Sequence, residues 1–140
     1  MERPLTVGQL ARATGVLAKT IRYYEQVGVL PMPQRSGAGY RQYSRHDVHR
    51  LLFMRRARAL GLSLAKLKAL TAELDSGECL TMRPRLYELV TEQLRTVQQQ
   101  IAEFHVLERQ LAQVLERLQT TAPTSHADGC QCLGSETSEA

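Results

Sequence analysis

The chain has no tryptophan and only two phenylalanines and five tyrosines among its 140 residues. Because aromatic side chains dominate the burial energetics of cores, their scarcity argues against a large globular domain and favours helices packed through narrow Leu, Val and Ala seams. No apolar run approaches the roughly 20 residues that cross a bilayer, and the first residues, MERPLTVGQL, lack the apolar stretch of a signal peptide. We therefore expect a cytoplasmic protein with no membrane partner.

Cysteine is scarce as well, with three thiols at Cys79, Cys130 and Cys132. An odd number cannot all pair within one chain, and a reducing compartment disfavours disulfides, so the thiols indicate metal binding or redox chemistry. The sequence also lacks a nucleophile–base arrangement and a glycine-rich phosphate loop. These absences argue against an enzyme.

Positive charge is concentrated in the first part of the chain. Residues 1–60 hold eleven Lys or Arg against three acidic residues, whereas residues 61–140 hold seven against eleven. The net charge is therefore +8 in the first part and −4 in the second, within a total of +4. This asymmetry predicts a front half that binds a polyanion and a solvated rear half.

The basic part carries the signals of a helix-turn-helix followed by a wing. The motif TVGQ at residues 6–9 is a capping box that starts a helix, which is expected to end near Gly15. A second helix is expected over 17–27, after a tight turn. Pro31 prevents its continuation, and the sequence RSGAG at 35–39 is turn chemistry that predicts a small hairpin wing.

A long helix is expected over 83–119, with Pro84 in its first turn. Its apolar residues recur at steps of three and four, a heptad seam typical of paired helices. A narrow stripe flanked by Gln, Glu and Arg cannot be buried by one chain of this size, so we expect a homodimer. The alternative is packing of the seam on the chain's own front part. The seam consists of Val90, Leu94, Val97, Ile101, Phe104, Leu107, Leu111, Val114 and Leu118.

These signals together predict a mainly α fold. Capped helix starts at Ser44 and Ser63 add two helices to the front part. We expect a winged helix-turn-helix domain with its following helices over 1–75, a connector over 76–82, an antiparallel dimerisation coiled-coil helix over 83–119, and a flexible, metal-binding tail over 120–140.

The second helix of a helix-turn-helix presents its N-terminal residues to base edges in the major groove. Lys19, Thr20 and Arg22 occupy that place, with Tyr23 beside them. Lys19 and Arg22 can reach guanine acceptors or phosphates, and Thr20 can reach a thymine methyl group or a phosphate. Tyr40 and Arg41, expected at the wing tip, and Arg35 would contact the DNA backbone. A third basic cluster near the end of the third helix consists of Arg55, Arg56 and Arg58. Each alone could be a solvated charge, but the combination predicts binding to double-stranded DNA.

The stretches TVGQLARATGVLAKTIRYYEQVGVL and RSGAGYRQYSRHDVHRLLFMRRARALGLSL resemble the winged helix-turn-helix of MerR-family transcription regulators. The resemblance is close throughout residues 5–75. The long helix that follows is similar in type. It implies a dimer that binds a promoter with an overlong spacer and, with its ligand bound, twists the DNA so that RNA polymerase can use it. It also implies DNA contacts from Lys19, Arg22, Tyr24, Arg35, Tyr40, Arg41, Arg55 and Arg58.

The three thiols do not easily meet within one copy of the chain. A helix of about 37 residues after Cys79 spans roughly 55 Å, and the roughly 11 residues between its end and Cys130 return at most about 40 Å. In an antiparallel pair of helices, Cys79 of one copy lies beside Cys130 and Cys132 of the other, which predicts two three-thiolate sites. Such sites select thiophilic ions, namely zinc, cadmium, lead, mercury or copper(I), and His126 or water could complete a tetrahedral zinc site.

The position of Cys79 is similar to that of a cysteine in the divalent-metal-sensing members of the family. Those members usually place the second cysteine at the end of the long helix, whereas Cys130 and Cys132 come later here. We expect a metal-responsive DNA-binding regulator. Two alternatives stay open: a regulator whose thiols respond to redox conditions, and a coiled-coil metal carrier without specific DNA recognition.

Overall fold

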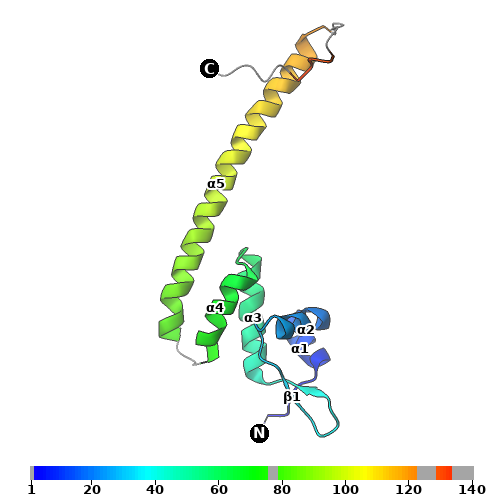
Figure 1. Ribbon diagram of the computed structural model, residues 1–140, viewed down its shortest axis with the longest axis vertical. Helices are drawn as coiled ribbons and strands as arrows, with labels where there is room; N and C mark the ends of the chain where they lie inside the picture. Colours follow the sequence, from blue (N-terminus) through cyan, green and yellow to red (C-terminus); the bar gives the residue numbers. More distant parts are fainter. Residues whose placement is uncertain (1, 76–78, 123–128, 134–140) are drawn as a thin grey trace. The chain divides into compact units, whose positions relative to one another are not determined.

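The computed structural model describes residues 2–75, 79–122 and 129–133. Within them, the elements along the chain are α1 (Val7–Thr14), α2 (Ala18–Gln26), β1 (Gln34–Arg35), β2 (Arg41–Gln42), α3 (Arg45–Ala59), α4 (Leu64–Asp75) and α5 (Cys79–Thr120). Figure 1 shows α1 and α2 beside α3, with the hairpin extending from this group. The predicted mainly α fold is confirmed.

The helix-turn-helix forms where the capping residues predict it. The Thr6 hydroxyl accepts a hydrogen bond from the Gln9 N–H at 3.2 Å, and the Gln9 side chain accepts one from the Thr6 N–H at 2.9 Å. Gly15 ends α1 with φ of 69°, and a Cβ at this position would clash with the Arg55 guanidinium. Glycine is therefore required at this turn for both its backbone conformation and its small size.

The hairpin of β1 and β2 is the predicted wing. The two strands pair antiparallel, with Arg35 opposite Arg41. The Ser36 N–H donates to the Tyr40 carbonyl at 2.8 Å and closes the connecting loop. At the base of the wing, Leu5 and Tyr43 exchange backbone hydrogen bonds of 2.8 and 2.9 Å. The segment that precedes α1 thus holds the wing against the helical part.

The core joins the helix-turn-helix to the helices that follow it. α3 packs against both α1 and α4. Fully buried side chains come from α1, α2, α3 and α4 and from the segments between them: Leu10, Thr14, Ile21, Val29, Leu30, Tyr43, Leu51, Met54, Leu62, Leu67 and Leu70. The wing and α2 are therefore attached to one common core.

The long helix α5 begins at Cys79, so the expected start at residue 83 is wrong by four residues. Cys79 is the first helical residue rather than part of a connector, and Pro84 lies inside the helix. Pro84 is the sixth residue of the helix, so it removes the N–H that would bond to the carbonyl of Leu80, and its ring lies against that carbonyl.

The first turns of α5 pack with the front part of the chain. Met82, Leu86 and Leu89 lie against the core, and Lys66 Nζ is 3.2 Å from a Glu92 carboxylate oxygen. By its internal packing the chain divides into two units, Met1–Leu94 and Arg95–Ala140. The division by function, with a DNA-binding domain over 1–75, stays a prediction.

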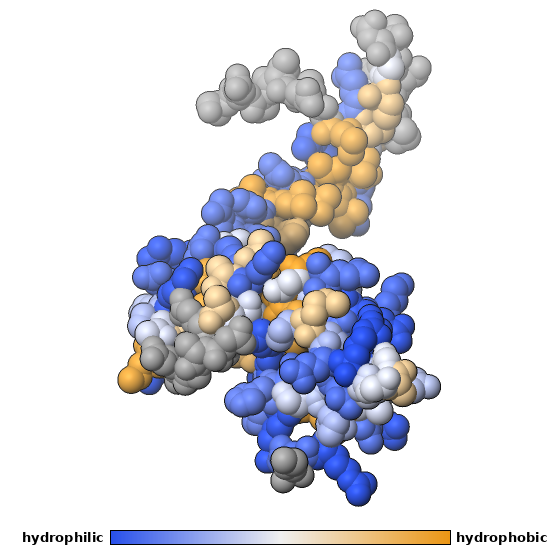
Figure 2. Space-filling view, turned by 60° about the horizontal axis from the view of Figure 1, so that its bottom comes forward, coloured by the Kyte–Doolittle hydropathy of each residue, from blue (hydrophilic) through white to orange (hydrophobic). Residues whose placement is uncertain are grey.

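The predicted seam of α5 is exposed in the single chain. Figure 2 shows hydrophobic side chains, in orange, gathered along the helix, and Phe104, for example, is 68% exposed. Contiguous exposed apolar surface of this kind marks an interaction site. Within the described ranges, none of the helices combines the length and the apolar character that a bilayer crossing needs.

Candidate functional site

The residues expected to face a DNA groove are accessible on α2. Lys19, Arg22 and Tyr23 are exposed, and Thr20 is partly exposed. All four lie in the first two turns of the helix. These turns therefore present two cations, a hydroxyl and a phenol on a helix of nine residues, which is short enough to enter a major groove.

Tyr24 is placed differently from its neighbour Tyr23. It is only 8% exposed and belongs to the core cluster, because it lies three residues after the buried Ile21 on the same face of α2. Its side chain therefore packs in the core, and the expected DNA contact from Tyr24 stays a prediction.

The tip of the wing presents an exposed tyrosine, Tyr40. Arg35 supports the tip, since its Nη1 donates to the Gly39 carbonyl at 2.8 Å. The Ser36 hydroxyl accepts a hydrogen bond from the Tyr40 N–H at 3.2 Å. A guanidinium has five N–H donors, so Arg35 can hold the turn and still contact an anion. Arg35 and Tyr40 thus lie where the sequence predicts.

Glu25 joins α2 to the wing, a role that the motif analysis missed. Its side chain is buried, with the whole residue only 5% exposed. One carboxylate oxygen, Oε1, accepts a short hydrogen bond from the Tyr43 hydroxyl, and the other, Oε2, lies 3.4 Å from Arg41 Nε. The expectation that Arg41 stands at the wing tip is therefore corrected, because it lies on β2 with its guanidinium partly turned inward.

The sequence does contain a signal for the burial of Glu25. It follows the buried Ile21 by four residues, so the two share one face of α2. A carboxylate on a buried face requires donors. The candidates were the donors of the wing, Arg41 and Tyr43, but only the fold shows that they reach it. Burial and the hydrogen bond to Glu25 raise the pKa of Tyr43 well above its usual value.

Two arginines of the third basic cluster also bind the protein's own backbone. Arg55 Nη1 donates to the Thr14 carbonyl at 2.9 Å, which ties α3 to the turn of the helix-turn-helix. Arg58 Nη1 donates to the Leu62 carbonyl at 3.0 Å. Both residues are exposed, like Arg56, so their remaining donors are accessible. Arg55 and Arg58 thus have a structural role in addition to their predicted phosphate contacts.

The structure places two of the three predicted metal ligands next to each other. Cys130 and Cys132 are exposed, and their sulfurs lie 2.9 Å apart. The hydrogen bond with Cys132 lowers the pKa of the Cys130 thiol, while the same contact raises the pKa of Cys132. Cys79 begins α5, but its side chain, like all of His126, lies outside the described residues. Among the described residues, no three His, Cys, Asp or Glu side chains gather around one point.

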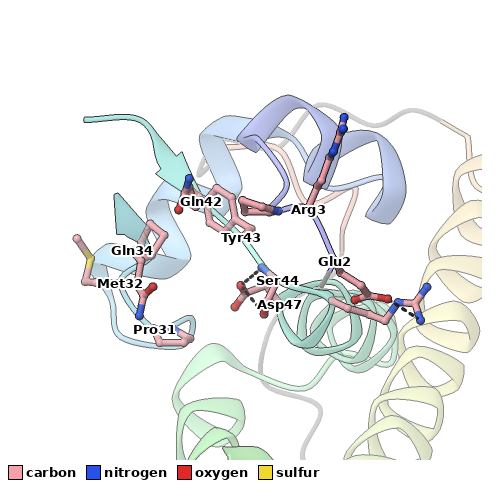
Figure 3. A pocket seen from close by; sticks show the side chains of 12 residues that line it. Glu2, Arg3, Pro31, Met32, Gln34, Gln42, Tyr43, Ser44 and Asp47 are labelled. Carbon is pink, nitrogen blue, oxygen red and sulfur yellow. Dashed lines mark hydrogen bonds and ion pairs between the residues drawn. The ribbon is translucent and has the colours of Figure 1, made fainter. Parts of the chain in front are cut away.

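A pocket of about 390 Å³ lies between the first residues, the segment around Pro31 and the start of α3 (Figure 3). Its polar groups are used internally. Glu2 lies 3.2 Å from an Arg45 nitrogen, and the Ser44 N–H and hydroxyl donate to the Asp47 carboxylate at 2.7 and 3.1 Å. These bonds stabilise the start of α3, and we assign the pocket no binding role.

Two sequence profiles match the chain. The profile described as "MerR HTH family regulatory protein" matches residues 5–74, and the profile described as "MerR, DNA binding" matches residues 48–114. Together they span the helix-turn-helix, the wing, α3, α4 and most of α5.

Individual relatives carry names that refer to metals or to transcription. The mercuric resistance operon regulatory protein of Bacillus cereus is 36% identical over 113 residues, which are 79% of this chain and 83% of that protein. The HTH-type transcriptional regulator HmrR of Sinorhizobium medicae is 44% identical over 68 residues, only 49% of this chain and 46% of that protein. The structure of PbrR691 from Ralstonia metallidurans in complex with lead(II) has a TM-score of 0.72 and 29% identity, over 92% of this chain and 96% of that one.

The raised pKa of Tyr43 gives a prediction for alkaline solution. A phenol whose pKa is higher in the folded than in the unfolded state stabilises the fold fully below about pH 10, and this contribution declines as the pH rises further. Above pH 10, the free energy of unfolding of the wild type should therefore fall more steeply than that of Tyr43→Phe, by up to about 1.4 kcal/mol per pH unit. Urea unfolding of both proteins between pH 8 and 11.5, at one protein concentration, measures the two slopes; equal slopes would contradict the assignment.

Proposed function

The chain belongs to the MerR family of helix-turn-helix regulatory proteins, and from this premise we propose that it regulates transcription by binding promoter DNA in response to a thiophilic metal ion. The family is one of transcription regulators rather than enzymes. The observation that carries the DNA-binding part is the joint presentation of an exposed basic helix, α2, and an exposed wing tip on one core. That combination suits a groove and the phosphates beside it.

The contacts divide between base edges and backbone. We assign Lys19, Thr20, Arg22 and Tyr23 to the major groove, because they occupy the exposed first turns of α2. We assign five side chains to phosphates: Arg35 and Tyr40 of the wing, and Arg41, Arg55 and Arg58 through the N–H groups that do not bind the protein itself. Charge supports this division, since residues 1–60 carry a net +8 and phosphate contacts dominate the affinity of DNA-binding proteins.

We propose that two copies pair through α5. The seam from Val90 to Leu118 is exposed along the helix, and an α-helix with such a stripe is stabilised by burying it against another helix. A second copy supplies a matching stripe with twofold symmetry. The antiparallel arrangement is favoured because it brings Cys79 of one copy toward the tail of the partner subunit.

The metal site would use Cys79 together with Cys130 and Cys132 of the partner subunit. The adjacent sulfurs of Cys130 and Cys132 support a soft ion, because thiolates are the ligands that soft ions prefer. Among the relatives, one is named for mercuric resistance and PbrR691 is in complex with lead(II). When bound, zinc, cadmium, lead or mercury would supply a cross-link between two copies, with His126 or water as a possible fourth ligand to zinc.

Metal binding would shift the orientation of the two DNA-binding parts. A ligand that binds one arrangement of the dimer more tightly than another moves the population toward it. The family resemblance implies that the favoured arrangement distorts the promoter so that RNA polymerase can start transcription. The metal-free protein would then act as a repressor and the metal-bound protein as an activator.

One observation also favours a redox response as a second candidate function. The sulfurs of Cys130 and Cys132 are close enough to react with each other. A redox regulator would respond to oxidant through these two thiols without Cys79. A metal sensor of the kind proposed requires Cys79.

Arg22→Ala tests the groove assignment. Loss of a guanidinium that contacts a base should weaken specific binding by about 1–3 kcal/mol, roughly 5- to 150-fold in Kd. The duplex for the test is selected by the wild type from a random-sequence pool, and affinity is measured by fluorescence anisotropy at fixed salt. Arg109→Ala, which removes an exposed arginine of α5, is the matched control and should bind like the wild type. Wild-type affinity in Arg22→Ala would refute the assignment.

Ile101→Asp tests the dimer. An uncompensated charge buried in the seam should weaken the dimer by roughly 3–5 kcal/mol, or at least 100-fold in Kd. Sedimentation equilibrium of the reduced protein measures the association. Gln113→Asp adds the same side chain at an exposed residue outside the seam and should leave the dimer intact. A monomeric wild type, or an unaffected Ile101→Asp, would contradict the proposal.

Cys79→Ser tests the metal site. The variant should keep its affinity for the selected duplex and lose the response to metal, because one of three thiolates is gone. Run-off transcription with RNA polymerase, across zinc, cadmium, lead, mercury and copper(I) with thiols kept reduced, measures the response. His105→Ala, at an exposed residue of α5, is the control. Normal activation of Cys79→Ser by metal would rule out this ligand set.

A further inference from the structure

The two oxygens of the Glu25 carboxylate are engaged by two different residues of the wing. Oε1 accepts from the Tyr43 hydroxyl, and Oε2 lies 3.4 Å from Arg41 Nε. Glu25 belongs to α2, Arg41 belongs to β2, and Tyr43 directly follows β2. One buried carboxylate therefore connects the helix assigned to the groove with the wing assigned to the phosphates.

Among the described residues, the guanidinium of Arg41 has one partner, the Glu25 carboxylate. Its Nε is buried and makes no hydrogen bond, although it lies in ion-pair range of Glu25. The side chain as a whole is 31% exposed, against 2% for that of Glu25. An arginine fork can bind a carboxylate on one edge and a phosphate with its remaining N–H groups. The inward Nε and partial exposure of Arg41 fit this division.

We propose that Glu25 is a positioning residue that orients Arg41 toward one phosphate of the bound DNA, and that Tyr43 fixes the rotation of the Glu25 carboxylate. The proposal rests on the proposed DNA-binding function and adds a specific contact to it. Glu25 does not touch DNA; it acts through Arg41. Without it, Arg41 would keep its charge but lose its fixed direction, and bidentate recognition of a phosphate depends on direction.

A purely structural role for the network would have a different signature. Buried ion pairs are weak evidence for stability, because desolvation opposes their attraction. If the network served only to stabilise the fold, its loss would lower the fraction of folded protein and would weaken all DNA contacts together. A positioning role affects the single phosphate that Arg41 reaches and leaves the base contacts of α2 unchanged. The Tyr43 hydroxyl is protonated at neutral pH even at the ordinary tyrosine pKa of about 10, so it can donate to Glu25.

The experiment replaces phosphates of the selected duplex one at a time with neutral methylphosphonates. The wild type and Arg41→Gln are compared first. The phosphate of interest is the one whose neutralisation weakens DNA binding by the wild type but not by Arg41→Gln. We expect an effect of about tenfold in the wild type, the size of one charge-assisted contact. Glu25→Gln keeps the size of the side chain and removes its charge. It should lose most of the sensitivity at that same phosphate and keep sensitivity at the others.

Glu2→Gln is the matched control. Glu2 also pairs with an arginine, Arg45, at 3.2 Å, but its side chain is 66% exposed. This variant should show the wild-type pattern at every phosphate. Thermal unfolding of each variant verifies that it is folded at the assay temperature. If Glu25→Gln does not fold, Tyr43→Phe takes its place, because it keeps the aromatic ring and the Glu25 carboxylate and removes only the hydrogen bond to one carboxylate oxygen. This variant should lose at least half of the tenfold effect of neutralising that phosphate.

The outcomes separate the inference from the proposed function. The positioning role is overturned if folded Glu25→Gln or Tyr43→Phe loses as much affinity as the wild type when the phosphate assigned to Arg41 is neutralised. It is also overturned if no phosphate distinguishes the wild type from Arg41→Gln. In either case the duplex is still bound and the DNA-binding function stands. Failure of the wild type to select or bind any duplex would instead refute the proposed function itself.

Discussion

The arrangement of the DNA-facing surface depends on a buried carboxylate in a strongly basic part of the chain. The strands of the wing have two residues each, and an isolated two-stranded hairpin is marginally stable in water. The wing therefore takes its position from outside itself. The backbone bonds between Leu5 and Tyr43 hold its base, and Glu25 connects it to α2. An apolar residue at 25 could fill the same space but could not engage Tyr43 and Arg41 with two separate acceptors.

The long helix is subject to a different constraint. Its first turns pack on the core through Met82, Leu86 and Leu89, and the seam beyond them is exposed. Contacts within the chain therefore stabilise the start of the helix, and in the proposed dimer a second copy would stabilise the rest. In the proposed function, a change at the dimer contacts would alter DNA binding through this continuous helix.

Elements marked by local chemistry could be predicted from the sequence. The capping boxes at Thr6 and Ser44 and the glycine at 15 act over three or four residues, and the structure has them as expected. The start of α5 was predicted four residues too late because Pro84 was expected in the first turn of the helix, whereas it lies inside the helix. Tyr24 was assigned from the family resemblance, and its side chain lies in the core. Arg41 and Arg55 were assigned as basic residues, but their partners in the protein lie 16 and 41 residues away along the chain. Such partners follow from tertiary packing, which no local pattern encodes.

The arginines show why a count of basic residues does not describe a DNA-binding surface. Arg35, Arg55 and Arg58 each donate to a backbone carbonyl of the protein, and Arg41 faces Glu25. A lysine could replace their charge but not the geometry of these bonds, because an ammonium lacks the planar, rigid array of five donors that a guanidinium presents. The internal bond of each arginine restricts its rotamers before DNA arrives, so less side-chain entropy remains to be lost on binding. The same bonds that stabilise the turns thereby preorganise the surface for its ligand.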